Sequence, residues 1–329
     1  MDLLTDPLWI LFPTAGEEAV QVEEELAGFL PEKETVLTIG VFDGVHMGHK
    51  HLISKLLEES ARTGCLSGVV TFRQHPEDLF SSKTKLPFLT DIKTRTNLLR
   101  NEGVDIIVPL SFTTEIANFS ARQFISLLIK YLKMRGLVIG PDFALGKARE
   151  GNVDTLRQLG QKMDFEVTVV PPLQMDNEIV SSTTIRKALA DGDMEKYHKF
   201  TGRSFNLRGK VVHGTGRGVG LGFPTANLNI SRGQAIPPDG VYAGWAHING
   251  KVFQSMTNVG LCPTFDGNER TVEAYLLDYS GDIYGRELTV DFITKLRDEK
   301  KFATEDELKA QVAEDIRQGK AILDATGFN

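Results

Sequence analysis

The strongest constraint on the fold is an alternation of strand-like and helix-like segments between about residues 35 and 192. The short apolar runs that predict buried strands are 35–42, 66–72, 104–110, 136–140 and 165–173. The amphipathic stretches that predict helices are 49–64, 91–103, 120–136, 152–163 and 182–192. This alternation is typical of an α/β fold, in which helices wrap a parallel sheet.

After about residue 200 the pattern changes to period two and to turns, which predicts a mostly β second half. Asn249-Gly250 indicates a hairpin, and a second hairpin is predicted over 271–292 with a turn near Ser280-Gly281. Thr304 and Glu307 predict a capping box for a final helix at 305–327 that would lie against a small β-barrel.

The change of pattern predicts two domains. The predicted boundaries are an N-terminal domain at 1–188, a linker at 189–203 and a C-terminal domain at 204–329.

The charge balance narrows the range of partners. A net charge of −7 and a pI near 5.6 argue against a nucleic-acid or anionic-membrane partner, so any phosphate must be held locally.

Cys65 and Cys262 are the two cysteines, which fits a reduced compartment and gives no disulfide framework. The apolar N-terminal segment is interrupted by Asp6 and Pro7 and is too short to span a bilayer. We therefore expect a cytoplasmic protein with no membrane association; the sequence does not indicate an oligomeric state.

The stretch GVFDGVHMGHKHL, residues 40–52, joins the first predicted strand to the first predicted helix. Its glycines allow close approach of the backbone to a ligand, and the helix that follows begins with unpaired N–H groups and a positive dipole end. Such a helix start can bind an anion. His46 and His49 are three residues apart and would project from one face of the first turn, where they could donate hydrogen bonds to a phosphate.

Two other interpretations of these histidines stay open. They could be metal ligands, although the one further candidate nearby, His51, would point elsewhere on a helix. They could also be polar residues at a helix start that carry no chemistry.

A second candidate phosphate site is the segment VSSTTIRKAL at 180–189. Hydroxyl groups, helix N–H groups and the Arg186 guanidinium could together bind phosphate, and the alternative is an ordinary N-cap. Both candidate sites follow strands of the predicted sheet, at the end where open α/β sheets bind ligands.

The second half contains the glycine-dense segment HGTGRGVGLGFPTANL at 213–228. It matches neither common nucleotide fingerprint, but its N–H groups could face phosphates, with Thr225 and Asn227 available to Mg²⁺. The alternative is a flexible surface loop. Glu273 lies on the strand face opposite Val272 and Ala274, and it is either a general base or a solvent-exposed residue.

The chain resembles the bacterial bifunctional riboflavin kinase/FMN adenylyltransferase family over essentially its whole length. The motifs that carry the resemblance, in order, are GVFDGVHMGHKHL, TFRQHP, IGPDFALGKAREGN, VSSTTIR, GRGVGLGFPTANL, DGVYAG, NVGLCPTF, TVEAYLLD and LRDEKKF. Their order and spacing are highly specific to this family.

The resemblance implies two activities. The N-terminal half would be a Rossmann-like nucleotidyltransferase that moves the adenylyl group of ATP onto FMN, giving FAD and pyrophosphate. The C-terminal half would be a small β-barrel kinase that phosphorylates riboflavin to FMN and releases ADP. Mg²⁺ is the implied metal ion, with ATP as co-substrate.

The resemblance also implies roles for particular residues. His46 and His49 would stabilise charge at the transferred phosphate, and Glu273 would activate the attacking hydroxyl. Thr225 and Asn227 would organise Mg²⁺. The implied ATP and phosphate contacts are Gly40, Phe42, Gly48, Ser182, Thr183, Arg186, Gly216, Gly220, Gly222 and Thr225. The implied flavin contacts are Phe72, His75, Asp142, Phe143 and Arg297.

Four positions depart from the usual family pattern. Gln74 stands where proline is usual, and Cys262 replaces a frequent arginine. Ala144 and Leu145 stand where a larger basic and an aromatic residue are common. These departures bear on flavin affinity at the first site and on the loop shape around Cys262, and they remove no group assigned to catalysis.

Two rival functions remain to be distinguished. Adenylyl- or cytidylyltransferases for pantetheine phosphate or nicotinamide mononucleotide could share the histidine motif, but they leave the second half unexplained. A flavin-binding sensor or store without turnover would bind flavin and consume no ATP.

Overall fold

The computed structural model describes residues 22–80, 86–214, 218, 220, 222–231, 233–264 and 267–327. The chain divides into two compact units, Met1–Leu86 with Asp91–Gln174 and Pro87–Thr90 with Met175–Asn329. The division falls before the predicted boundary at 188 because helices α8 (Ser182–Ala190) and α9 (Met194–Thr201) belong to the second unit. The exact domain boundaries stay a prediction.

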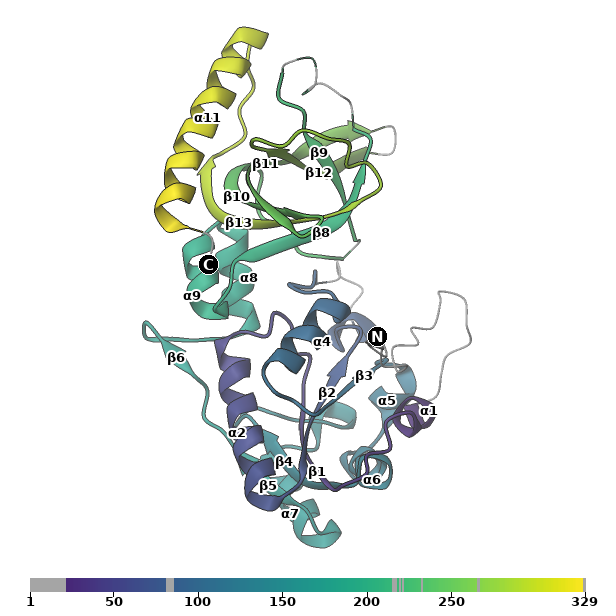
Figure 1. Cartoon of the computed structure of the whole chain (residues 1–329). Coiled ribbons are helices and arrows are strands. Elements are labelled where there is room, and N and C mark those ends of the chain that lie inside the picture. Colours follow the sequence, from purple (N-terminus) through teal and green to yellow (C-terminus); the bar gives the residue numbers. More distant parts are fainter. Residues whose placement is uncertain are drawn as a thin grey trace, which may run out of the picture. The chain divides into compact units, whose positions relative to one another are not determined.

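The first unit is built on a parallel sheet of five strands in the order β3-β2-β1-β4-β5, which confirms the predicted fold class (Figure 1). The strands are β1 (Thr35–Ile39), β2 (Leu66–Phe72), β3 (Ile106–Leu110), β4 (Met134–Ile139) and β5 (Glu166–Val169). All four neighbouring pairs run parallel. The carboxyl ends of the strands therefore meet at one edge, where ligands bind in such sheets.

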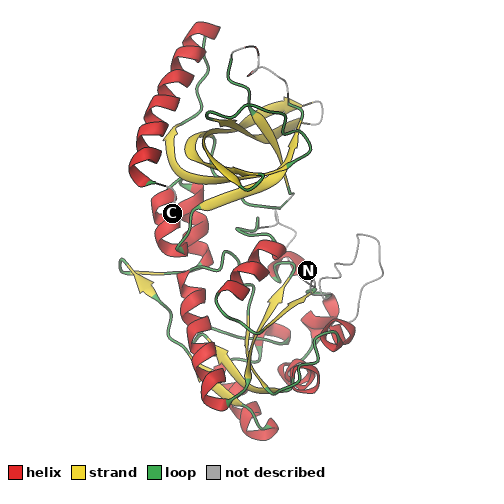
Figure 2. Ribbon diagram, viewed as in Figure 1, coloured by secondary structure: helices red, strands yellow, loops and turns green. Residues whose placement is uncertain are grey.

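Helices cover both faces of this sheet (Figure 2). One face packs against α2 (Met47–Thr63) and α4 (Ile92–Asn101) through Ile53, Leu56 and Leu99. The opposite face packs mainly against α6 (Ala121–Leu132), through a larger apolar cluster. The remaining elements before the barrel are α1 (Val22–Ala27), α3 (Glu77–Phe80), α5 (Thr114–Asn118), the 3₁₀ turn η1 (Lys147–Arg149), α7 (Val153–Met163) and a two-stranded ribbon, β6 (Gln174–Met175) and β7 (Glu178–Ile179).

The helix predicted at 120–136 is shorter than expected. Ser120 forms a capping box with Gln123 at its start, but the helix ends at Leu132, where Lys133 adopts a left-handed conformation with φ 51°. The residues from Met134 onward instead begin strand β4. The apolar pattern continues through the break, so periodicity alone does not show where the helix stops.

The second unit contains a closed six-stranded antiparallel barrel, as predicted for the second half (Figure 1). The order around the barrel is β10-β11-β12-β9-β8-β13. The strands are β8 (Phe205–Val212), β9 (Ala226–Ile230), β10 (Gly240–Ile248), β11 (Lys251–Thr264), β12 (Gly267–Leu276) and β13 (Glu287–Arg297). The final helix α11 (Glu305–Thr326) packs outside the barrel around Met256 and Leu323.

One predicted hairpin is confirmed and the other is wrong. Asn249 and Gly250 turn β10 into β11 with φ of 51° and 73°, the left-handed pair that a two-residue hairpin needs. Strands β12 and β13, predicted to pair over 271–292, are not neighbours in the barrel. β13 lies between β10 and β8 and forms its hydrogen bonds with these two strands, because the barrel closes there.

The predicted capping box of the last helix forms in a modified way. Thr304 Oγ1 accepts a hydrogen bond from the Glu307 N–H at 3.2 Å. The Glu307 carboxylate accepts from the Ala303 N–H at 3.0 Å, one residue before the cap.

Candidate functional site

The loop after β1 has an unusual backbone. Phe42, Gly44 and Val45 have positive φ values of 53°, 79° and 34°, and the side chains of Phe42 and Val45 are buried. Such conformations cost energy and persist where packing holds them, often at functional sites. Because the Phe42 ring belongs to the core cluster under α2, the contact predicted for Phe42 with phosphate could come only from its main chain.

His46 and His49 meet at the start of α2, where His46 precedes the first helical residue. His46 is the N-cap, and its Nδ1 accepts a hydrogen bond from the His49 N–H at 3.2 Å. The two imidazole rings stack with centroids 3.5 Å apart, and the Phe42 ring lies 5.0 Å from His49. Gly48 lies in the first turn between them. The structure thus places two imidazoles beside the positive end of a 17-residue helix.

A group of buried polar residues links this loop to the end of β2. The Arg95 guanidinium, 1% exposed, donates to the Phe72 carbonyl at 2.8 Å and lies 3.8 Å from the Asp43 carboxylate. His75, predicted to contact flavin, is also buried, with its Nε2 3.8 Å from Asp43. No sequence signal singled out Arg95, because an arginine in an amphipathic helix is usually exposed.

A largely apolar cavity of about 720 Å³ lies at the carboxyl ends of β1 and β2. The predicted residues Gly40, Phe72, Asp142 and Phe143 line it, and His75 does not. The other lining residues include Ile39, Val41, Phe112, Ile116, Phe124, Ala144, Leu145 and Arg149. Its volume is in the range of small-molecule sites. Sequence reasoning missed Phe112, whose signal is an aromatic residue just after a predicted strand.

The candidate site on the barrel joins strands β9 and β12. Thr225 Oγ1 donates a hydrogen bond to Glu273 Oε2 at 3.2 Å, and Asn227 is the register partner of Glu273. Glu273 is half-buried on the face opposite Val272 and Ala274, as alternation predicted. The structure therefore brings Thr225, Asn227 and Glu273 together.

The glycine-dense segment approaches these residues closely where it is described. A Cβ added to Gly214 would lie 2.2 Å from Asn227 Nδ2, and one added to Gly218 would lie 3.2 Å from Thr225 Oγ1. Gly222 has a positive φ of 86°, and at both Gly220 and Gly222 a Cβ would stand in open space. The predicted contact Gly216 lies outside the described residues.

Arg297, predicted to contact flavin, has a close partner at the end of β13. Its guanidinium forms a bidentate ion pair with Asp315 of α11, with the shortest N–O distance 2.7 Å, and lies 5.8 Å from the centre of the Phe302 ring. Both partners of the ion pair are largely buried, which fixes α11 against the barrel. The sequence did not indicate this pairing.

The predicted phosphate residues Ser182, Thr183 and Arg186 lie in the first turns of α8. Ser181 caps the helix by accepting from the Thr184 N–H, so the N-cap interpretation holds for Ser181. Ser182 is half-buried, Thr183 is exposed, and Arg186 Nε is 3.4 Å from the Pro87 carbonyl oxygen.

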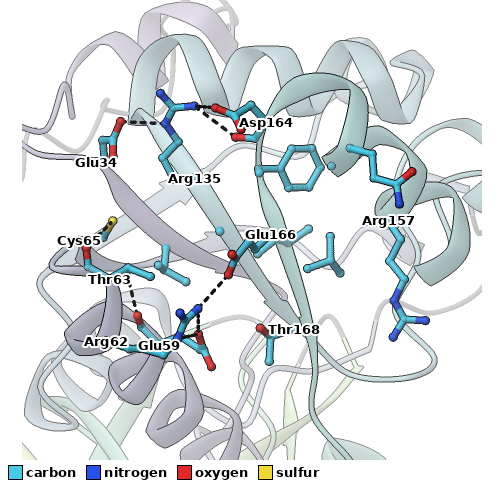
Figure 3. A pocket seen from close by; sticks show the side chains of 17 residues that line it. Glu34, Glu59, Arg62, Thr63, Cys65, Arg135, Arg157, Asp164, Glu166 and Thr168 are labelled. Carbon is cyan, nitrogen blue, oxygen red and sulfur yellow. Dashed lines mark hydrogen bonds and ion pairs between the residues drawn. The ribbon is translucent and has the colours of Figure 1, made fainter.

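A second cavity, of about 700 Å³, lies at the amino ends of β1, β4 and β5 (Figure 3). Arg62 bridges Glu59 and Glu166, and Arg135 contacts Glu34 and Asp164. None of the predicted site residues lines it. Because carboxylates already neutralise these two arginines, this cavity gives no argument for an anion site.

Two features of the described residues bear on the metal-ligand and membrane alternatives. Among these residues, no cluster of three or more His, Cys, Asp or Glu side chains could hold a metal ion. Within the same part of the chain, none of the helices has the length and apolar character needed to cross a membrane.

Each half of the chain matches a known protein family. A family model described as FAD synthetase matches residues 30–184, and one described as riboflavin kinase matches 201–323. A protein of Escherichia coli strain K12, named bifunctional riboflavin kinase/FMN adenylyltransferase, is 37% identical over 287 residues, which cover 87% of this chain and 91% of the relative. A protein of the same name from Pseudomonas fluorescens is 35% identical and covers 92% of this chain and 98% of the relative.

A solved structure with a similar fold carries a different description. It is described as a macrolide-efflux protein from Streptococcus pneumoniae and is 30% identical, with a TM-score of 0.82. The match covers 89% of this chain and 95% of that one.

Proposed function

This chain belongs to the bifunctional riboflavin kinase/FMN adenylyltransferase family, and on that basis we propose which of its residues carry the two reactions. The enzyme phosphorylates riboflavin to FMN with ATP, and it adenylylates FMN to FAD with release of pyrophosphate. We assign the adenylyltransferase to residues 1–188 and the kinase to 204–329, joined by a linker at 189–203.

The adenylyl transfer is assigned to the start of α2. The FMN phosphate oxygen attacks the α-phosphorus of ATP, the bond from that phosphorus to the bridging oxygen breaks, and pyrophosphate leaves. His46 and His49 stabilise the charge that develops on the phosphate oxygens, aided by the N-terminal end of the helix. The observation that supports this role most is the stacked imidazole pair at that helix start.

The substrate contacts of the adenylyl transfer are proposed residue by residue. We propose that Gly40, Phe42 and Gly48 contact ATP through their main chains, and that Ser182, Thr183 and Arg186 bind phosphate oxygens. The cavity of about 720 Å³ takes the flavin ring of FMN, because its aromatic and aliphatic lining matches a flat apolar ring. Phe72, Asp142 and Phe143 line that cavity.

The kinase reaction is assigned to Glu273 on β12. The terminal ribityl hydroxyl of riboflavin attacks the γ-phosphorus of ATP, Glu273 takes the hydroxyl proton, and ADP leaves. The hydrogen bond from Thr225 supports this assignment, because it shows that the carboxylate can reach a hydroxyl on this face. Gly220 and Gly222 are proposed phosphate contacts, as is Gly216, and Arg297 is a proposed flavin contact.

The side chains around Glu273 suit Mg²⁺. Thr225 and Asn227 offer hydroxyl and amide oxygens, the hard ligands this ion prefers, and Gly214 leaves space that a Cβ would fill beside the Asn227 amide. The absence of a dedicated carboxylate cage among the described residues agrees with an ion held mainly by ATP phosphates. When bound, Mg²⁺ would neutralise phosphate charge.

The cellular context is part of the proposal. We place both reactions in the cytoplasm, where ATP is available and the two cysteines stay reduced. The acidic net charge of −7 supports small-molecule substrates without a nucleic-acid partner.

The assignment of two separate sites is tested with two variants of the full chain. Riboflavin, FMN and FAD are separated by chromatography after incubation with ATP and Mg²⁺. His49→Ala is expected to depress FAD formation from FMN and to leave FMN formation from riboflavin near normal. Glu273→Ala is expected to abolish the kinase step and spare adenylylation of supplied FMN. Loss of both activities in either folded variant would contradict the assignment.

A further inference from the structure

The wall of the apolar cavity contains a pair of aromatic side chains from neighbouring strand ends. Phe72 ends β2, and Phe112 follows β3. Their rings meet edge to face at 85°, with centroids 5.3 Å apart. Because one ring comes from the last residue of β2 and the other from the loop after β3, the shape of the wall depends on how these two chain segments are held together.

The backbone that carries Phe112 has left the sheet. The last backbone hydrogen bond between the two strand ends runs from the Arg73 N–H to the Leu110 carbonyl at 2.9 Å. Beyond it, side chains supply the acceptors. Glu25 of α1 accepts from the Ser111 N–H at 2.8 Å, and Gln74 Oε1 accepts from the Phe112 N–H at 3.0 Å.

Gln74 itself does not line the cavity. It is exposed, two residues after Phe72, and its amide oxygen reaches the main chain of Phe112. The hydrogen bond therefore connects the loop that follows Phe72 to the loop that carries Phe112. An apolar side chain of similar size would leave the Phe112 N–H without this acceptor and release one end of the pair.

We propose that Gln74 is a positioning residue for FMN at the adenylyltransferase site, where its amide oxygen holds Phe112 against Phe72 in the wall that receives the flavin ring. The inference rests on the proposed function, because it takes this cavity as the flavin site. Gln74 acts through Phe112 and has no role in the transfer of the adenylyl group.

The test uses three substitutions that differ in the acceptor they present. Gln74→Leu removes the acceptor at similar size, Gln74→Glu keeps an oxygen at the same reach, and Gln74→Asn keeps the amide but shortens it by one methylene. FAD formation is measured with supplied FMN and ATP, together with riboflavin phosphorylation and the melting temperature.

The expected result is a selective change in flavin binding. Gln74→Leu and Gln74→Asn should raise KM for FMN about threefold to tenfold, the effect of losing one hydrogen bond. The adenylylation kcat should change little, because ground state and transition state lose the same contact. KM for ATP, the kinase rate and the melting temperature should stay at wild-type values, and Gln74→Glu should retain a KM for FMN near that of the wild type.

Phe112→Ala separates the two ways in which the idea can fail. If Phe112→Ala raises KM for FMN and Gln74→Leu does not, the role of Gln74 is refuted and the flavin cavity stands. If neither variant changes KM for FMN, the assignment of the cavity is wrong. If Gln74→Leu lowers the melting temperature and changes KM for ATP equally, Gln74 has a general structural role and the proposal is overturned.

Discussion

Replacing Gly214 with alanine should impair the kinase by displacing one side chain. Gly214 is exposed and its φ is outside the left-handed region, so alanine can adopt its backbone conformation. Its new Cβ would stand 2.2 Å from Asn227 Nδ2, whereas Cβ atoms essentially never come within 3.0 Å of such a neighbour. The Asn227 amide must therefore move by at least about 0.8 Å.

The size of the effect follows from that displacement. Because the amide is the far end of a flexible side chain, the fold should accommodate the change with a nearly unchanged melting temperature. A misplacement of about 1 Å in a catalytic arrangement can cost about a hundredfold in rate. We expect kcat for riboflavin phosphorylation to fall by about that factor in Gly214→Ala, with adenylylation of supplied FMN as the internal control.

A double-mutant cycle tests whether the effect acts through Asn227. Asn227→Ala removes the side chain that the new Cβ would displace, so adding Gly214→Ala to it should cause no further loss of kinase activity. The reasoning would be refuted if Gly214→Ala alone phosphorylated riboflavin at the wild-type rate. Full additivity of the two substitutions would show that Gly214 acts by another route.

Three further outcomes can be measured. Burial raises the pKa of the Tyr242 phenol above its ordinary value of 10.0, so the native state keeps a proton that the unfolded chain loses. The contribution of Tyr242 to the free energy of unfolding should be fully present below pH 10 and lost as pH rises further. In urea unfolding, Tyr242→Phe should show a smaller loss of stability above pH 10 than the wild type. At pH 8 the variant should be about 1 kcal/mol less stable, because it loses the hydrogen bond to the Pro238 carbonyl. Asp315→Ala should lower the free energy of unfolding by about 3 kcal/mol, because the largely buried Arg297 guanidinium loses its carboxylate partner and keeps only its hydrogen bond to the Asp298 carbonyl; a change under about 0.5 kcal/mol would contradict this. EDTA should stop both product-forming steps without lowering the melting temperature, since the proposed Mg²⁺ arrives mainly with ATP; a fall in melting temperature would indicate a structural metal ion.

The parts of the fold that the sequence predicted depend on local patterns. Alternating apolar runs and helices predicted the parallel sheet, and Asn249-Gly250 predicted its hairpin, because the backbone angles of that turn are a local property. The pairing of β12 with β13 failed because barrel closure is decided by strands far apart in the sequence. A turn signal near Ser280 does not show which strands become neighbours.

In the candidate sites, too, the sequence predicted features within one motif and missed contacts between separate elements. His46 and His49 belong to one motif, and both lie at the helix start as predicted, although the N-cap position of His46 was not foreseen. The pairings of Arg95 with Asp43 and of Arg297 with Asp315 join separate elements, and a single sequence gives no signal for such contacts. His75 belongs to a predicted segment, yet its buried side chain faces Asp43.

The hydrogen bond that caps α2 also fixes the tautomer of a proposed catalytic imidazole. Nδ1 of His46 must keep its lone pair to accept from the His49 N–H, so the neutral ring carries its hydrogen on Nε2. The ring can then offer that Nε2 hydrogen as a donor while its other nitrogen holds the helix start in place. Substitution of His46 will therefore change helix initiation and the donor together, and His46→Asn, which can still cap the helix, would separate the two effects.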